Sequence, residues 1–194
     1  MNIIGPEELS KLPWLVGEHL AVPKISFSEQ VLATHEETHI LIFTPAVPKL
    51  TLAGMREIFG TDPLKREPCM YNQNWYLNEK FANVPGDGTW HLVRKEVLED
   101  VRAKPPEEIE SNLADTTFPS AITAALTFFA WYELHGEALW KHDFLWCADR
   151  DHNGDRIYVG RYVDPDGINK NGFNIHRHLS LRSAHSAAPE ITGA

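Results

Sequence analysis

One segment of this 194-residue chain restricts its fold more than any other. From Ala121 to Leu134 the residues are almost all apolar, and only two threonines and one glutamate interrupt them. The run Thr117–Ser120, which contains a proline, is suited to open a helix here, and Gly136 is suited to close it. A helix that is apolar on nearly every side is buried on nearly every side. Because the segment is shorter than the roughly 18 apolar residues of a membrane span, it predicts a core helix.

Strands are predicted on both sides of this helix. β-branched and apolar residues predict one over Thr38–Thr44, and another, Thr89–Val93, follows a turn-forming Pro-Gly-Asp-Gly sequence. After the helix, Asp143–Asp149 and Arg156–Val163 are joined by a turn containing Asn-Gly, which is typical of a β-hairpin, and Phe173–Arg182 follows as the last strand. Antiparallel strands gathered after a central helix predict an α+β protein, with the long buried helix packed on an antiparallel sheet that carries a C-terminal β-hairpin.

The chain is predicted to form a single domain over residues 1–194. Three prolines and two glycines before residue 24 predict an irregular N-terminal arm over residues 1–30, with one short helical piece at Glu7–Leu12. The small, polar segment 183–194 is predicted to be a frayed tail. Short helices are also predicted from Thr51 onwards and after a Lys-Pro-Pro sequence that ends at Pro106.

Composition argues against several classes of protein. A formal net charge of −9 argues against a protein that binds a nucleic-acid backbone over a broad surface. The two cysteines form no Cys-x-x-Cys pair and are too few for a disulfide framework, so a reducing compartment fits best. The first residues also lack the pattern of a secretory signal. We therefore predict a cytoplasmic protein outside the membrane, whose partner is a small ligand or another protein.

The segment His35-Glu36-Glu37-Thr38-His39 matches the H-E-x-x-H motif of zinc hydrolases. On a helix, His35 and His39 would both face one Zn²⁺, and Glu36 would act as the general base on a metal-bound water. The β-branched residues that follow favour a strand instead, in which the two His would lie roughly 13 Å apart and could not share a metal. The alternative is a polar turn that leads into a buried strand.

The turn of the predicted hairpin offers a second metal hypothesis. Asp149, Asp151 and Asp155 alternate before and after an Asn-Gly pair, which resembles the first half of an EF-hand calcium loop. The second half does not match, because Gly160 stands where the loop needs a bidentate Glu. Asp, Asn and Gly are also the residues that tight turns select without any metal.

Two histidines in the last predicted strand complete the hairpin hypothesis. His176 and His178 are two residues apart, so on a strand they share a face at about 7 Å, a spacing that suits joint metal binding. If this strand lies beside the hairpin, Asp149 and Asp151 would complete the coordination of a divalent ion, either Zn²⁺ or Ca²⁺. The alternative is a pair of solvated His.

An aromatic and amide-rich stretch around Trp75, together with Trp90, would suit the walls of a sugar or nucleobase pocket. We therefore add Trp75, Trp90 and Asp155 to the candidate ligand-binding residues. The alternative is that these rings belong to the core.

Three short sequence motifs resemble those of known proteins: WYLN, which begins at Trp75, DRIYVGRY, which begins at Asp155, and NGFNIHRH, which begins at Asn171. Through these motifs the segment Asn72–Arg182, rather more than half of the chain, is similar to a family of uncharacterised bacterial proteins. The resemblance implies no activity and no catalytic residue. The leading hypothesis is therefore a binding module that uses the hairpin face for an ion, a small ligand or a protein partner. The alternatives are a zinc-dependent hydrolase and a self-associating interaction protein.

Overall fold

The computed structural model describes residues 1–161, 172–177 and 180–192. Within these residues the chain forms two mainly antiparallel sheets and one long helix, which confirms the predicted α+β class. The helices are α1 (Pro6–Leu9), α2 (Glu29–Thr34), α3 (Leu52–Phe59), α4 (Pro106–Glu110) and α5 (Ala121–His135), with two 3₁₀ turns, η1 (Phe81–Asn83) and η2 (Glu99–Val101). The strands are β1 (Asn2–Ile4), β2 (His39–Thr44), β3 (Thr89–Arg94), β4 (Thr116–Thr117), β5 (Phe144–Arg150), β6 (Arg156–Arg161), β7 (Phe173–His176), β8 (His185–Ser186) and β9 (Glu190–Ile191).

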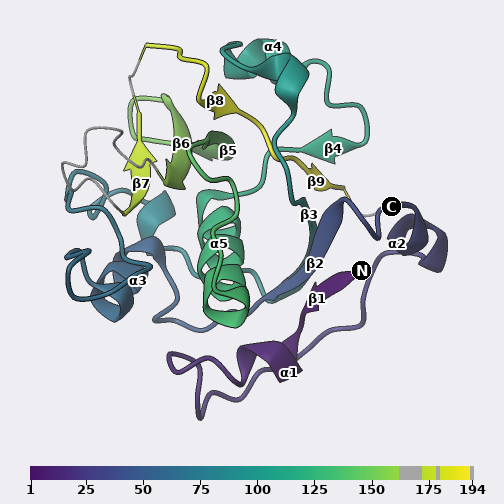
Figure 1. Cartoon of the computed structure of the whole chain (residues 1–194), viewed down its shortest axis with the longest axis vertical. Coiled ribbons are helices and arrows are strands. Elements are labelled where there is room, and N and C mark those ends of the chain that lie inside the picture. The colour runs from purple at the N-terminus through teal and green to yellow at the C-terminus, as the bar shows by residue number, and fades with distance from the viewer. Residues whose placement is uncertain (162–171, 178–179, 193–194) are drawn as a thin grey trace.

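Helix α5 occupies the centre of the molecule, with β1, β2 and β3 on one side and β5, β6 and β7 on the other (Figure 1). It begins where the Ser120 Oγ accepts a hydrogen bond from the Thr123 N–H, and it ends at Gly136, whose φ of 73° is left-handed. Its first eleven residues are all buried. On its core side Phe129 lies 4.0 Å from Phe59 of α3 and 5.6 Å from Phe173 of β7, measured between ring centroids. Each such buried ring stabilises the fold by about 1.5–3 kcal/mol.

The two sheets differ from the single sheet that the sequence predicts. One sheet has the strand order β1-β2-β3-β9-β4 and the other β7-β6-β5-β8. In the second sheet, alternate residues of the predicted hairpin face opposite sides. Leu145 and Cys147 join the main core with α5, whereas Phe144 and Trp146 join a second apolar cluster that includes Ile109 of α4.

Both chain ends are more ordered than predicted. The expected irregular arm contributes β1, which pairs in parallel with β2. The expected frayed tail contributes β8, parallel to β5, and β9, which lies between β3 and β4. Ala187 and Ala188 between these strands are fully buried. The prediction of a frayed tail is therefore wrong, because Ala187 and Ala188 pack into the two apolar clusters of the protein. No described helix has the length and apolar character needed to cross a membrane.

Candidate functional site

A cavity of about 520 Å³ lies at the N-terminal end of α5. Strands of both sheets border it: His91 comes from β3 and Glu190 from β9, whereas Asp149 comes from the end of β5. Apolar side chains, among them Phe81, Val84, Phe118 and Ile122, form much of its wall. We call this cavity the helix-start pocket.

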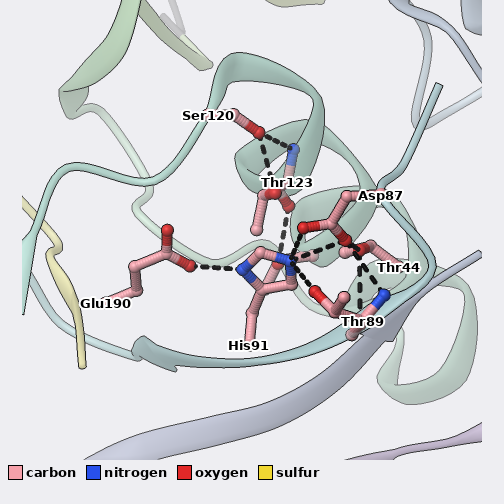
Figure 2. Close-up of polar contacts among 8 residues, drawn as sticks. Thr44, Asp87, Thr89, His91, Ser120, Thr123 and Glu190 are labelled. Carbon is pink, nitrogen blue, oxygen red and sulfur yellow. Dashed lines mark hydrogen bonds and ion pairs between the residues drawn. The ribbon is translucent and has the colours of Figure 1, made fainter. Parts of the chain in front are cut away.

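His91 is held between two carboxylates at one side of this pocket (Figure 2). Its Nδ1 lies 2.6 Å from Glu190 Oε2, and its Nε2 lies 3.0 Å from Asp87 Oδ1. The pairing of β3 with β9 places Val93 opposite Glu190, which brings the Glu190 side chain alongside the strand that carries His91. Asp87 precedes β3 in a turn, where it also accepts a hydrogen bond from the Thr44 hydroxyl at 2.7 Å.

These contacts set the charge of His91. Burial by itself would lower the pKa of His91, but the hydrogen bonds and negative charges of Asp87 and Glu190 outweigh it and raise this pKa to about 9. Burial likewise opposes ionisation of Asp87, but its hydrogen bonds with His91 and Thr44 hold the pKa of that carboxyl well below its usual range. At neutral pH His91 is therefore an imidazolium that donates to a carboxylate from each nitrogen.

The start of α5 forms another side of the pocket. The Ala121 N–H donates to Asp149 Oδ2 at 2.6 Å, and the Thr123 N–H donates to Ser120 Oγ at 3.1 Å. The Ser120 and Thr123 hydroxyls lie 2.8 Å apart (Figure 2). Burial raises the pKa of Asp149, and the hydrogen bond from Ala121 offsets only part of this effect. The chain's own carboxylate therefore occupies the position beside the helix N-terminus.

Among the less exposed groups of the pocket the balance of charge is negative. Asp149 and Glu190 contribute carboxylates there and His91 contributes the cation, whereas the Asp87 side chain is 54% exposed. Lys80 and Arg150 also border the pocket, but both are exposed. The Arg150 guanidinium donates to the Gly154 carbonyl at 2.8 Å, so its charge is directed towards the hairpin turn.

A second group of charged residues lies at the tip of the β5–β6 hairpin. His152 Nδ1 is 2.5 Å from Glu79 Oε1, and the His152 N–H also donates to this carboxylate at 3.1 Å. Arg177 forms ion pairs with both Asp151 and Glu79, and its guanidinium carbon lies 4.4 Å from the centre of the Trp75 ring. We call Glu79, Asp151, His152 and Arg177 the hairpin network.

Three members of the hairpin network have the residue types of a metal site. Ligand atoms of Glu79, Asp151 and His152 all lie within 4.8 Å of one another, and this is the one such group among the described residues. However, the Asp151 carboxylate accepts hydrogen bonds from the N–H groups of Asn153 and Asp155, at 2.8 and 2.9 Å, and pairs with Arg177. Burial would raise the pKa of Asp151, but these partners together lower it. The network is thus an ion-pair cluster in which Arg177 already supplies the cation.

The predicted metal set is not assembled in the described structure. His176 packs against Phe144 and Tyr158 of the second apolar cluster, each 5.5 Å away between ring centroids, whereas Asp149 contacts the start of α5. Burial and the nearby His185 lower the pKa of His176 to about 4. The residue that reaches Asp151 is Arg177, because alternation along the strand points His176 the other way. His178 lies outside the described residues.

The H-E-x-x-H segment is neither the helix that the zinc hypothesis requires nor an extended strand. Helix α2 ends at Thr34, and β2 begins at His39. The His39 N–H donates to the His35 carbonyl at 3.0 Å across a turn, so the two rings lie 4.6 Å apart between centroids. The Glu36 carboxylate lies 2.7 Å from the amino group of Met1. The helical zinc motif is therefore not formed, and the alternative of a turn leading into a buried strand matches the structure.

Neither tryptophan of the ligand hypothesis lines the pocket, although Trp75 lies 6.2 Å from the pocket-wall residue Phe81 between ring centroids. The Trp75 indole N–H donates to the Ile175 carbonyl at 3.0 Å, and the Trp90 N–H donates to the Pro23 carbonyl at 2.9 Å. Each ring thus joins segments distant in sequence. Asp155 lies in the hairpin turn, where its N–H donates to Asp151.

Of the site residues predicted from sequence, Asp149 is the one that lines the helix-start pocket. The prediction misses Asp87, His91 and Glu190. The closeness in sequence of Asp87 to His91, within a turn and strand that were predicted, was a usable signal. Glu190 gave none, because it falls in the segment expected to fray. Comparisons with models of protein families, with curated proteins and with solved structures find no match for this chain.

Proposed function

We propose that this protein binds a small organic molecule in the helix-start pocket. One observation carries the proposal: an imidazolium between two carboxylates, a half-buried carboxyl with a raised pKa and a helix-start hydroxyl all border one cavity with apolar walls. Ligand sites are typically concave and mostly apolar, with a few convergent polar groups. Ionisable groups with shifted pKa values gather at such sites.

The contacts favour binding over acyl transfer. A serine nucleophile needs a base within hydrogen-bond reach. The Ser120 hydroxyl instead contacts Thr123, and both nitrogens of His91 face carboxylates. In this proposal His91 supplies a fixed charge and holds β9 against β3, and Asp149 and Ser120 offer polar contacts to the ligand.

The proposal retains part of the hairpin hypothesis. Ala148, Asp149 and Arg150 lie at the end of β5, just before the hairpin turn, and all three border the pocket. The end of β5 beside the hairpin turn, and not the turn with its ion-pair network, is therefore the proposed binding surface. A net charge of −9 and two cysteines in 194 residues support a small-molecule ligand over nucleic acid and a cytoplasmic location for the protein.

A fragment screen by nuclear magnetic resonance tests this proposal. We expect hits to shift the backbone amide signals of His91, Ser120, Thr123 and Glu190 together. The variant Ala148→Phe, which places a ring at the pocket wall, should abolish these shifts.

The matched control is Ala33→Phe, an exposed alanine on α2 that does not border the pocket. It should bind the same fragments as the unmodified protein. A screen whose hits leave these amide signals unchanged, or whose hits bind equally well to Ala148→Phe, would overturn the proposal.

A further inference from the structure

The helix-start pocket carries an excess of negative charge on its buried side. The side chains of Glu190 and His91 are only 13% and 15% exposed, and they form one ion pair. The charge that acts on Asp149 is that of Arg156, which lies outside the pocket wall and forms an ion pair with Glu110 at 2.5 Å. Asp87 shares the charge of the same His91, and its side chain is 54% exposed. The less exposed side of the pocket therefore carries the carboxylates of Glu190 and Asp149 against one imidazolium when all are ionised.

An anionic ligand is disfavoured at this position. The N-terminus of a long helix commonly binds anions through its unpaired N–H groups. Here the Ala121 N–H is taken by Asp149 and the Thr123 N–H by Ser120. A phosphate or carboxylate would have to displace an internal carboxylate and then lie beside it. The helix N-terminus thus presents a negative group to the pocket.

From these contacts we infer that the ligand is an organic cation, specifically a primary or secondary amine carried on an apolar body. This inference rests on the proposed function. The ammonium group would donate to the Asp149 carboxylate and the Ser120 hydroxyl. The body would lie against the apolar wall at Phe81, Phe118 and Ile122. Hydrogen bonds between two charged groups are roughly twice as strong as neutral ones, so charge is what selects this ligand.

The raised pKa of Asp149 agrees with this assignment. Its burial penalises the ionised carboxylate, and the hydrogen bond from Ala121 and the charge of Arg156 offset only part of this penalty. An ammonium group at hydrogen-bond distance stabilises the ionised form and removes the penalty. Binding of the amine should therefore release a proton wherever Asp149 is partly protonated, and amine affinity should rise with pH across that range.

Three probes of the same shape test the inference: benzylamine, benzyl alcohol and benzoate, which near pH 7 are a cation, a neutral molecule and an anion. Binding is measured by the amide shifts of Ser120 and Thr123 and by calorimetry. We expect benzylamine to bind about tenfold more tightly than benzyl alcohol, a difference of about 1.4 kcal/mol, and benzoate to bind most weakly. The advantage of benzylamine should shrink as salt is added, since salt screens the charge.

A matched pair of variants assigns the effect to one carboxylate. Asp149→Asn retains an oxygen that accepts the Ala121 N–H but removes the charge, so benzylamine should lose about tenfold in affinity while benzyl alcohol is unaffected. Glu57→Gln removes an exposed carboxylate of α3 outside the pocket and should change neither affinity.

The outcomes separate the two proposals. If benzyl alcohol or benzoate binds in the pocket as tightly as benzylamine, the cation inference is overturned and the pocket remains a ligand site. If none of the three probes binds, both proposals fail. If Asp149→Asn does not fold, the salt dependence of benzylamine binding to the unmodified protein decides, and an affinity that does not change with salt contradicts the inference.

Discussion

The molecule holds two His–carboxylate clusters that look alike in composition and differ in what neutralises them. In the helix-start pocket, His91 is 15% exposed and is itself the cation between Asp87 and Glu190. In the hairpin network, the His152 side chain is 64% exposed, and Arg177 supplies the cation for Asp151 and Glu79. The first cluster depends on the protonation of an imidazole, whereas the second depends on a guanidinium that stays charged at all accessible pH.

This difference separates a ligand site from a structural joint. Arg177 saturates the hairpin network, since it joins β7 to the hairpin tip and to the segment that carries Glu79. The Asp149 carboxylate borders an open cavity and forms no side-chain ion pair with a described residue, because Arg156, whose charge acts on it, is paired with Glu110. The cluster whose carboxylates are not all neutralised by a side-chain cation is therefore the one that can bind a ligand.

The largest effect should come from removing the cation of the hairpin network. Arg177→Met leaves the carboxylates of Asp151 and Glu79 buried without their cation, and breaking a buried pair in this way costs about 3–5 kcal/mol. Urea unfolding measures the loss. Arg150→Met, which removes an exposed arginine nearby, is the control and should cost less than about 1 kcal/mol. Equal losses in the two variants would contradict the structural role of Arg177.

The next effect tests whether His91 is charged. Its pKa is about 9 when folded, above the ordinary 6.5, so its stabilising contribution is complete below pH 6.5 and is lost as pH rises through about 9. His91→Gln should lower the free energy of unfolding by about 2–3 kcal/mol at pH 7. The variant should also lose the fall in stability between pH 7 and pH 10 that this group causes. An unchanged alkaline profile would show that His91 is neutral in the fold.

A histidine of the opposite kind gives a smaller effect of opposite sign. Burial lowers the pKa of His176 to about 4, so its contribution is complete above pH 6.5 and is lost as pH falls towards 4. His176→Phe should pack against the same rings of Phe144 and Tyr158. It should reduce the stability lost between pH 7 and pH 5 by about 1–2 kcal/mol, as followed by urea unfolding at each pH. If the variant loses as much stability between pH 7 and pH 5 as the unmodified protein does, His176 is not buried in the fold.

Local signals explain which parts of this fold the sequence predicts. The C-terminal end of helix α5 is predicted to within a residue because Gly136 follows the apolar residues directly, whereas the helix begins at Ala121, after the proline expected in its first turn. The hairpin is predicted because Asn-Gly defines its turn. The strands β8 and β9 have two residues each, too few for any periodic pattern, and their partners lie far away in the chain.

The candidate site follows the same rule. Asp149 could be nominated because it stands beside the hairpin turn. The bond between His91 and Glu190 joins residues 99 positions apart, and that between Glu79 and His152 joins residues 73 apart. Pairing over such distances is decided by how the two sheets meet around α5, which no local pattern encodes.

The smallest loss of stability should come from substitution of His152, and a small loss would support the contrast between the two clusters. The side chain is mostly exposed, and Arg177 remains to neutralise Glu79 when the imidazole is removed. His152→Gln retains the N–H that donates to Glu79, so it should cost less than about 1 kcal/mol at pH 7. Measured beside His91→Gln by the same urea unfolding, it should leave the alkaline profile intact. A loss as large as that of His91→Gln would mean that the hairpin network also relies on a protonated imidazole, and the distinction between a saturated and an incomplete cluster would fall.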